Sequence, residues 1–512
     1  MGQIDADVDQ LHGAAPVFWP NAREGNSILT KKSLFNRNLA SRCSGFVSWC
    51  AARLPALMVL VCLLVVLPQS ASARLAGPQE GWTPGETTRD LAAVRASGQL
   101  RVLVNQSRHS SGEVRGESIG VEYRRLRAFE QYLNRTARDG REVRLKLIPL
   151  PKEQLLSALL RGEGDLVAPG ELLPVRRGMA VRASAPLQRD VPLVVVARQG
   201  NRRYQRLEQL AGRSLALPAG SAARDALLRI NAGLKTPIVA DWQDPSLAVE
   251  DVLELVHAGI LPMTAVELPI AERWAKVLPK LRIDRHLQLT KKGDMSWYVQ
   301  RAAPNLRASV DRFLRDYRAP ADQDAAFLRV YRRLYKVHYP LGRLERQRLE
   351  RVRPTLMQHA RGQSLDWLLL AALAFKESTL NPAARGAGGA TGLLQITPAA
   401  ARSVGVANAA TLEGNVQAGA KYLAMIRRRY FASAQFNERE RMAFVLAAYN
   451  LGPQRVQRLR AEARRRGLNP NQWFFQVERL AAERFGMGVV SYVSSVNKYH
   501  LAFARERYRL EP

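Results

Sequence analysis

A single glutamate ends a nearly uninterrupted hydrophobic helix late in the sequence. The segment SLDWLLLAALAFKES places Glu377 in the last turn of a predicted helix, on the same stripe as Leu370 and Leu373. Apolar surroundings and the negative end of the helix dipole both disfavour an ionised carboxylate, so we expect a raised pKa for Glu377. A carboxylic acid that stays protonated near neutral pH can act as the general acid in cleavage of a glycosidic bond.

The elements that would position Glu377 are indicated by the residues before and after it. Ser364 is the predicted N-cap of the helix, with Asp366 in the first turn, where a negative charge complements the helix dipole. The helix is apolar on every face, which predicts that it is buried. The glycine-rich segment GAGGATG then predicts a turn that lets a bulky ligand approach the backbone. Glu377 could instead be an ordinary residue at a frayed or salt-bridged helix end. The residues that follow it in the sequence distinguish a catalytic acid from such a helix end.

Those neighbours resemble the lytic transglycosylase domain of the soluble lytic murein transglycosylase (SLT) type. The matching positions are Glu377, Ser378, Pro382, Gly392, Leu393, Leu394 and Gln395, then Asn415 to Leu423, then Ala448, Tyr449, Asn450 and Gly452, and finally Tyr492. The resemblance implies a goose-type lysozyme-like helical fold with Glu377 as the catalytic residue. It also implies non-hydrolytic cleavage of the MurNAc-GlcNAc β-1,4 bond to 1,6-anhydroMurNAc ends, with no metal and no cofactor.

One carboxyl group is sufficient for this reaction, because it first gives a proton to the leaving oxygen and then takes one from the sugar's 6-hydroxyl group. An inverting hydrolase would need a second carboxylate to activate water. Glu413 is the best nearby candidate for that second group, although it is also interpretable as a solvated loop residue.

Five further residues are candidate substrate-binding residues, and each has a structural alternative. They are Ser378, Gln395, Tyr449, Asn450 and Tyr492. Gln395 could bind sugar groups or satisfy loop backbone, and the Tyr449-Asn450 pair could face the substrate's acetamido group or form a helix C-cap. Tyr492 could orient Glu377 through its hydroxyl group or be a core tyrosine.

The motif also departs from the family pattern. Gly386 stands where the family usually has a serine within reach of the bound sugar, and Leu394 replaces the usual methionine. Loss of the serine hydroxyl would remove one substrate contact worth about 1 kcal/mol of binding free energy. The proton-transfer chemistry would stay intact.

The region before this domain alternates strand-like and helical segments from about residue 98, which predicts parallel sheets with helices on their faces. Over residues 98–320 the order of these segments resembles the two-lobed periplasmic solute-binding proteins of the polar amino-acid class (family 3). That resemblance makes Arg177 the candidate for a ligand carboxylate and Gly220 with Ser221 the candidate anion-binding loop at a helix N-terminus. Glu267 lies near the position of the family's second acid. A docking or regulatory module that no longer binds free amino acids is the alternative.

The predicted organisation is therefore an α+β multidomain chain with a two-lobed α/β domain followed by a mainly α lysozyme-like domain. The predicted divisions are a leader over 1–73 with an apolar h-region over 54–68, the two-lobed domain over 90–325, a basic linker over 326–353 and the catalytic domain over 354–512. The combination resembles the membrane-bound lytic murein transglycosylase F architecture.

The residues of the predicted leader indicate where in the cell the protein is located. A basic stretch, the h-region and the small residues before Arg74 are typical of a secretory signal, and cleavage after Ala73 would remove all three cysteines, Cys43, Cys50 and Cys62. A retained inner-membrane signal anchor is the alternative. We expect a periplasmic protein of a Gram-negative-type envelope, peripheral to the outer membrane.

The net charge of +32 predicts an anionic partner, although an Arg-rich composition also arises from genome bias. We expect peptidoglycan glycan strands and the envelope membrane surface as partners, with a muropeptide or amino acid as a possible ligand of the two-lobed domain. The secretion signal, and the lack of a basic helix interleaved with stacking aromatic residues, argue against nucleic acid. A catalytically weak glycan- or muropeptide-binding sensor and a lysozyme-type hydrolase remain the alternatives to a lytic transglycosylase.

Overall fold

The structure is a computed structural model that describes residues 88–511 except 112, 115–116, 119, 138–139, 246 and 333. The predicted leader, its h-region and the three cysteines lie outside the described residues. Within the described ranges, no helix has both the length and the apolar character needed to span a bilayer.

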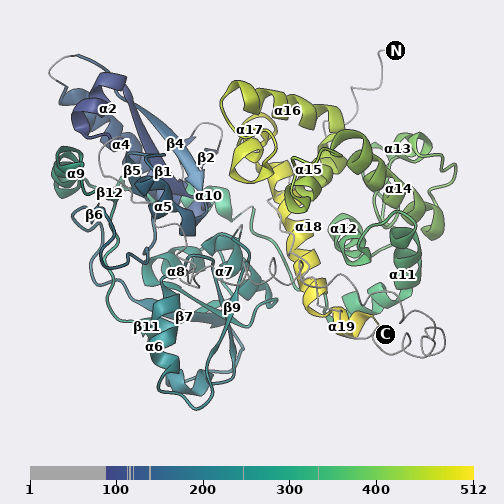
Figure 1. Ribbon diagram of the computed structural model, residues 1–512. Helices are drawn as coiled ribbons and strands as arrows, with labels where there is room; N and C mark the ends of the chain where they lie inside the picture. The colour runs from purple at the N-terminus through teal and green to yellow at the C-terminus, as the bar shows by residue number, and fades with distance from the viewer. Residues whose placement is uncertain are drawn as a thin grey trace, which may run out of the picture. The chain divides into compact units, whose positions relative to one another are not determined.

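The first lobe is built on a five-stranded sheet of order β4-β1-β5-β12-β6 (Figure 1). Its strands are β1 (Gln99–Asn105), β4 (Arg144–Leu150), β5 (Leu166–Ala168), β6 (Val181–Ala183) and β12 (Tyr298–Gln300). Its other elements are α2 (Leu91–Ser97), α3 (Arg108–Ser111), the hairpin β2 (Glu113–Val114) and β3 (Glu117–Ser118), α4 (Val121–Arg135), η1 (Lys152–Gln154), α5 (Leu155–Leu160) and α9 (Pro304–Asp316). Because β1 is parallel to β4 and β5, the carboxyl ends of these strands share one edge of the sheet.

The second lobe has its own five-stranded sheet, of order β11-β7-β10-β8-β9. Its strands are β7 (Leu193–Arg198), β8 (Ser214–Leu217), β9 (Val239–Trp242), β10 (Met263–Glu267) and β11 (Leu281–Thr290). Its helices are η2 (Leu207–Leu210), α6 (Ala223–Asn231), α7 (Val249–Ala258) and α8 (Leu268–Ala275). Two sheets with helices on their faces confirm the predicted two-lobed α/β class.

The predicted parallel pairing holds for part of each sheet, and both sheets also contain antiparallel pairs. In the first lobe β12 runs antiparallel to β5 and β6, and in the second lobe β7 runs antiparallel to β10 and β11. β7 and β12 are the strands at which the chain has passed from one lobe to the other. A strand reached in this way is not tied to its neighbour by a β-α-β crossover, so its direction is not fixed as parallel.

The rest of the chain is helical, with no named strand among the described residues after β12. Its elements are α10 (Gln323–Tyr331), α11 (Arg343–Arg361), α12 (Trp367–Ser378), η3 (Ala387–Gly389), α13 (Pro398–Ser403), α14 (Leu412–Tyr430), α15 (Glu438–Leu451), α16 (Pro453–Arg465), η4 (Trp473–Val477), α17 (Glu478–Phe485), α18 (Met487–Arg505) and α19 (Arg507–Leu510). Figure 1 shows α12 with other helices around it, and α11 and α18 pack directly against it. This confirms the predicted helical second part.

The start of α12 differs from the sequence-based expectation. Ser364 lies before the helix with a positive φ of 53°, and the N-cap is Asp366, whose carboxylate accepts a hydrogen bond from the Leu368 N-H at 3.0 Å. The same carboxylate accepts hydrogen bonds from His500 and Arg507 near the end of the chain. The prediction of Ser364 as N-cap is therefore wrong, because a left-handed turn at this residue delays the helix until Asp366.

The segment between the two-lobed and the helical parts is not an open linker. Phe327 and Tyr331 of α10 are buried, and α11 runs without interruption from Arg343 to Arg361 with Pro354 inside it. The predicted domain boundary between residues 353 and 354 therefore falls within α11. The arginines expected there lie mostly on the outer side of this helix, whose inner side buries Leu349, Val352, Leu356 and Ala360.

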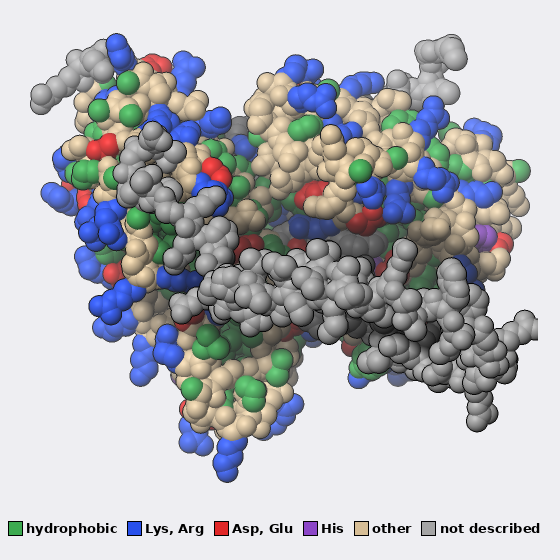
Figure 2. Space-filling view, in the orientation of Figure 1, with side chains coloured by type: hydrophobic (Ala, Val, Ile, Leu, Met, Phe, Trp, Pro, Cys, Tyr) green, Lys and Arg blue, Asp and Glu red, His purple; other side chains and the backbone are tan. Residues whose placement is uncertain are grey.

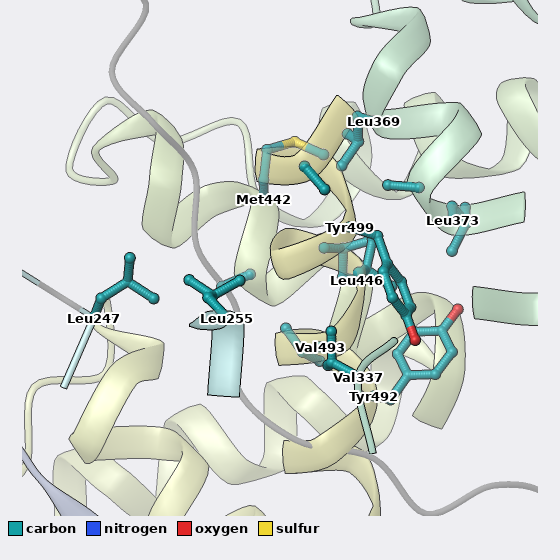
Figure 3. Close-up of a cluster of buried hydrophobic side chains, with 14 of the residues drawn as sticks. Leu247, Leu255, Val337, Leu369, Leu373, Met442, Leu446, Tyr492, Val493 and Tyr499 are labelled. Carbon is teal, nitrogen blue, oxygen red and sulfur yellow. The ribbon is translucent and has the colours of Figure 1, made fainter. Parts of the chain in front are cut away.

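A cluster of buried hydrophobic side chains connects α12 with α15, α18 and α7 (Figure 3). It includes Leu369 and Leu373 of α12, Met442 and Leu446 of α15, and Tyr492, Val493 and Tyr499 of α18, together with Val337, Leu247 and Leu255. Every residue of α12 from Trp367 to Phe375 is buried, as its all-apolar pattern predicts. This packing fixes the helix whose last turn carries Glu377.

Candidate active site

Glu377 lies in the last turn of α12, where the apolar helix meets the glycine-rich loop. Its carboxyl group is densely surrounded by protein, although part of the residue keeps contact with solvent. Burial raises the pKa of Glu377 to about 7, against the opposing effects of the Tyr492 hydroxyl group and the Lys376 ammonium group. A carboxyl group with a pKa near neutrality can both give and take a proton at neutral pH.

Tyr492 of α18 is the direct partner of Glu377. Its hydroxyl group donates a hydrogen bond to Oε1 of Glu377, and its side chain is 1% exposed. The ammonium group of Lys376 lies 5.9 Å from the centre of the Tyr492 ring. The tyrosine thus holds one carboxyl oxygen in place and leaves the other, Oε2, for a reacting group.

The chain reverses directly after Glu377 through two residues in the left-handed region, Thr379 and Leu380, with φ of 54° and 58°. Ser378 connects this turn to the returning loop, because its hydroxyl group donates to the carbonyl oxygens of Ala374 at 3.0 Å and Leu393 at 2.8 Å. In this structure the Ser378 side chain therefore bonds to the protein's own backbone.

Gln395 likewise bonds within the glycine-rich loop. Its Nε2 atom donates to the carbonyl oxygens of Gly392 at 2.8 Å and Ala384 at 3.2 Å. Gly386 lies against the same side chain, since a Cβ atom added at residue 386 would stand 2.2 Å from Oε1 of Gln395. The glycine that departs from the family pattern therefore leaves the room that the Gln395 side chain occupies.

Tyr449 and Asn415 hold the far side of this loop, and only the first was a predicted site residue. The Tyr449 hydroxyl group donates to the Leu394 carbonyl oxygen at 2.8 Å. Asn415 is buried on α14, accepts from the Leu394 N-H at 2.9 Å and donates to the Thr391 carbonyl oxygen at 2.8 Å. A buried Asn side chain needs hydrogen-bond partners, and Asn415 finds them in the backbone of this loop.

Asn450 and Glu413 lie apart from these contacts. Asn450 is partly exposed near the end of α15, whose C-cap is Gly452. The Glu413 side chain is 57% exposed and pairs with Nε2 of His359 at 2.5 Å. The structure thus places the second acidic candidate in an exposed ion pair in the first turn of α14.

The structure brings together some of the predicted ligand residues of the two-lobed domain and leaves one apart. Glu267 ends β10 and is buried, and Gly220 and Ser221 lie just before α6, with the Ser221 side chain buried. Arg177 is exposed in the turn ahead of β6. Gly220 and Glu267 both lie next to Lys152, which stands in no recognisable sequence motif.

Lys152 belongs to a buried polar network at the carboxyl edge of the first sheet. Its ammonium group donates to Glu171 at 2.6 Å, and Glu171 also accepts from the side-chain amide of Asn105. These three residues end or follow β4, β5 and β1. Polar residues at the carboxyl ends of adjacent parallel strands are a known sign of a ligand crevice, and that signal could have identified them.

The part of the chain that the structure describes has no cluster of three or more His, Cys, Asp or Glu side chains suited to a metal ion. Positive charge, in contrast, is widespread. On the face drawn in Figure 2, Lys and Arg side chains are spread over both the two-lobed and the helical regions and form no single patch.

Comparison with known proteins agrees with this geometry. Residues 355–471 match the family model described as Transglycosylase SLT domain, a stretch that contains Glu377, Gln395, Tyr449 and Asn450. The chain is 28% identical over 389 residues to "Membrane-bound lytic murein transglycosylase F" of Ectopseudomonas mendocina (strain ymp), covering 75% of this chain and 77% of that protein. It is 26% identical over 438 residues to the protein of the same name from Pseudomonas putida KT2440, covering 81% and 87%.

Solved structures similar to this one include an amino acid ABC transporter substrate-binding protein, AbpA, from Streptococcus pneumoniae, bound to L-arginine. It covers 48% of this chain and 97% of its own, with a TM-score of 0.37 and 17% identity. The crystal structure of Tv2483 bound to L-arginine covers 47% and 93%, with a TM-score of 0.38 and 20% identity.

Proposed function

We propose that this chain, a homologue of the membrane-bound lytic murein transglycosylases F over about three quarters of its length, is a peptidoglycan lytic transglycosylase with Glu377 as its catalytic residue. The observation that carries the proposal is the Glu377 carboxyl group itself. It is held by Tyr492 at the end of a buried helix, its pKa is about 7, and it keeps part of its surface toward solvent.

The reaction follows from the two protonation states of this one group. Protonated Glu377 donates its proton to the glycosidic oxygen as the MurNAc-GlcNAc bond breaks, and the resulting carboxylate then accepts the proton of the MurNAc 6-hydroxyl group. That hydroxyl oxygen closes on C1, so the product carries a 1,6-anhydro ring and no water is consumed. The substrate's acetamido group stabilises the positive charge at C1, as in the family that the motif resembles.

Tyr492 acts as a positioning residue in this scheme. Its hydrogen bond to Oε1 fixes the plane of the carboxyl group and favours the ionised form, which must be stable enough to form when the proton leaves. Ser378, Gln395 and Tyr449 support the loop over 379–395 through backbone contacts, and Asn450 is left as the candidate for a direct sugar contact.

The substrate and location follow as parts of the same proposal. Peptidoglycan strands are the substrate, and the protein works in the envelope, peripheral to a membrane surface whose anionic head groups match the net charge of +32. We propose residues 90–325 as the two-lobed domain and a catalytic domain that starts with α11 at Arg343, because a boundary at residue 354 would divide that helix.

Digestion of purified sacculi tests the activity. The soluble products of the wild-type protein, Glu377→Gln and Glu413→Gln are identified by mass spectrometry. We expect anhydro-muropeptides from the wild-type protein and from Glu413→Gln, and a loss of at least about 100-fold in rate for Glu377→Gln, since general acid-base catalysis contributes this much or more.

Each other outcome excludes the proposal in a different way. Reducing-end sugars in place of anhydro ends would mean a lysozyme-type hydrolase, and a dependence on Glu413 would identify it as the second carboxylate. Binding of sacculi without any product would mean a glycan-binding sensor.

A further inference from the structure

The space between the two lobes contains a buried group of one cation and two anions from this chain. Lys152 lies 2.6 Å from Glu171 and 3.7 Å from Glu267, measured from its Nζ atom to a carboxylate oxygen of each. The side chains of the three residues are at most 4% exposed. Lys152 and Glu171 belong to the first lobe and Glu267 ends β10 of the second, so the group joins the lobes.

The position of this group is that of a ligand site. Asn105, Lys152 and Glu171 end or follow the parallel strands β1, β4 and β5, and ligands of open α/β sheets bind at the carboxyl ends of such strands. Two carboxylates are suited to a primary ammonium group, which has three protons to donate. Here the ammonium group is the chain's own.

The loop with Gly220 packs closely against the first part of the Lys152 side chain. Gly220 of the second lobe lies so close that an added Cβ atom would stand 2.8 Å from the Glu153 nitrogen and 3.2 Å from Cβ and Cγ of Lys152. The loop with Gly220 and Ser221, predicted to meet an anion, is thus covered by Lys152 and Glu153.

Further contacts hold the lobes together around the lysine. The Leu172 N-H of the first lobe donates to Oε1 of Glu267 at 2.9 Å. Glu250 of α7 accepts from the Arg108 N-H at 2.6 Å and from the Ser107 hydroxyl group at 2.9 Å. These hydrogen bonds join residues of the first lobe to carboxylates of the second.

We propose that an ammonium-binding site lies between the lobes, formed by Glu171 and Glu267, and that Lys152 occupies it as a built-in ligand in place of a free amine or amino acid. The charges support this assignment. Burial lowers the pKa of Lys152, but Glu171 and Glu267 together outweigh it and raise the pKa above its ordinary value. The lysine is therefore a cation at neutral pH, as the site requires.

Removal of the lysine side chain tests the site, because it should create a vacancy that a small amine can fill. Thermal unfolding of full-length Lys152→Ala is measured alone and with increasing propylammonium chloride, with sodium chloride and 1-propanol as matched additives. We expect Lys152→Ala to unfold roughly 10 °C below the wild-type protein, because two buried carboxylates lose their cation. Propylammonium should raise the midpoint with the logarithm of its concentration, and the two other additives should not.

Two variants control the measurement. Lys152→Met fills the space without a charge, so we expect it to be destabilised but not rescued by propylammonium. The double variant Lys152→Ala with Glu171→Gln removes one of the two carboxylates and should fold even where the single variant does not; its rescue by the amine should be weaker than that of Lys152→Ala. The exposed Lys235→Ala should match the wild-type protein.

The wild-type protein gives the complementary result. With Lys152 in place, propylammonium, L-lysine and L-arginine should leave its unfolding midpoint unchanged. The proposal is overturned if any of these raises the wild-type midpoint through binding between the lobes. It is equally overturned if Lys152→Ala is as stable as Lys235→Ala, or if 1-propanol rescues it as well as the amine. None of these results depends on catalysis at Glu377.

Discussion

At the scale of single residues, burial of the Glu377 carboxyl group lowers the stability of the fold when the group is ionised. The same burial raises its pKa into the range that proton transfer at neutral pH requires. A carboxyl group with a pKa of about 7 in the folded protein and an ordinary value of 4.5 binds its proton more tightly when folded. Ionisation of Glu377 therefore costs the fold nothing below about pH 4.5. The cost grows between about pH 4.5 and 7, where only the unfolded form ionises, and stays constant above pH 7, where both forms are ionised.

Glu377→Gln should accordingly stabilise the protein, and only at higher pH. At pH 8 we expect a gain of about 2 kcal/mol in the free energy of unfolding, discounted from the full shift because the residue is partly exposed. At pH 4.5 the difference should nearly vanish. Urea unfolding at the two pH values measures it, and an equal difference at both would show that ionisation of Glu377 is not the cause.

Tyr492→Phe should change the pH dependence of catalysis. The hydroxyl group of Tyr492 favours the ionised form of Glu377, so its removal should raise the pKa of that carboxyl group further. Because the reaction starts from protonated Glu377, the alkaline limb of kcat/KM against pH should move to higher pH, while the maximal rate falls. Tyr499→Phe, on the same helix, is the control and should leave the limb in place.

At the scale of elements, the site depends on a loop held by side chains that face inward. The Gln395 side chain fills the space that a side chain at residue 386 would need. Asn415 and Tyr449 hold the other side of the loop through hydrogen bonds to the Leu394 backbone. The family serine at this place and the present Gln395 conformation exclude each other.

Gly386→Ser should therefore lower stability and activity through Gln395. The added Cβ atom would displace the Gln395 side chain from its two backbone acceptors, at a cost of about 1–3 kcal/mol. In the double variant with Gln395→Ala the space is free, so Gly386→Ser should cost much less there. Urea unfolding and sacculus digestion of the wild-type protein, the two single variants and the double variant measure the coupling energy between residues 386 and 395. Purely additive effects would show that the two side chains do not compete for the same space.

The sequence predicts the main elements of this site but not its contacts. The apolar run predicts buried α12 with Glu377 in its last turn, and the motif spacing identifies the loop. It does not predict that Asp366 is the N-cap, because Ser364 is an equally good capping residue and only the three-dimensional turn decides. Nor does it show that Gly386 makes room for Gln395, since such a contact depends on loop geometry rather than on spacing.

In the two-lobed domain, too, the sequence predicts the elements but not the contacts between them. Its strands and helices follow from hydrophobic periodicity, whereas the antiparallel direction of β7 and β12 depends on where the chain crosses between lobes. Lys152 and Glu171 have no motif of their own. They lie beside Glu267 because the ends of β4 and β5 in the first sheet face the end of β10 in the second, which no sequence pattern records.

At the scale of the whole molecule, a second buried lysine joins distant parts of the chain. Lys498 of α18 is 1% exposed and donates to Asp251 and Glu254 of α7, each at 2.6 Å. Both carboxylates are nearly fully buried, and Lys498 is the cation hydrogen-bonded to both, while Arg108 lies 3.9 Å from Asp251.

Lys498→Met should consequently be among the most destabilising single changes in the chain. It would remove the cation bonded to both buried carboxylates and leave Asp251 with only the more distant Arg108, at a cost of about 3–5 kcal/mol in the free energy of unfolding. Lys235→Met, at an exposed site, should cost less than about 0.5 kcal/mol. Urea unfolding of both variants measures the change in the free energy of unfolding. A decrease below about 1 kcal/mol for Lys498→Met would mean that the ion pairs of Lys498 with Asp251 and Glu254 contribute little to stability.

The continuity of α11 has a practical consequence for dissecting the protein. A fragment that starts at residue 354 would begin with a proline in mid-helix and lack Leu349 and Val352, which pack in the core with α12. A fragment that starts at Asp322 keeps α10 and all of α11. Inactivity of the shorter fragment would therefore report a damaged core, and could not be taken to mean that the helical part needs the two-lobed part to cleave glycan.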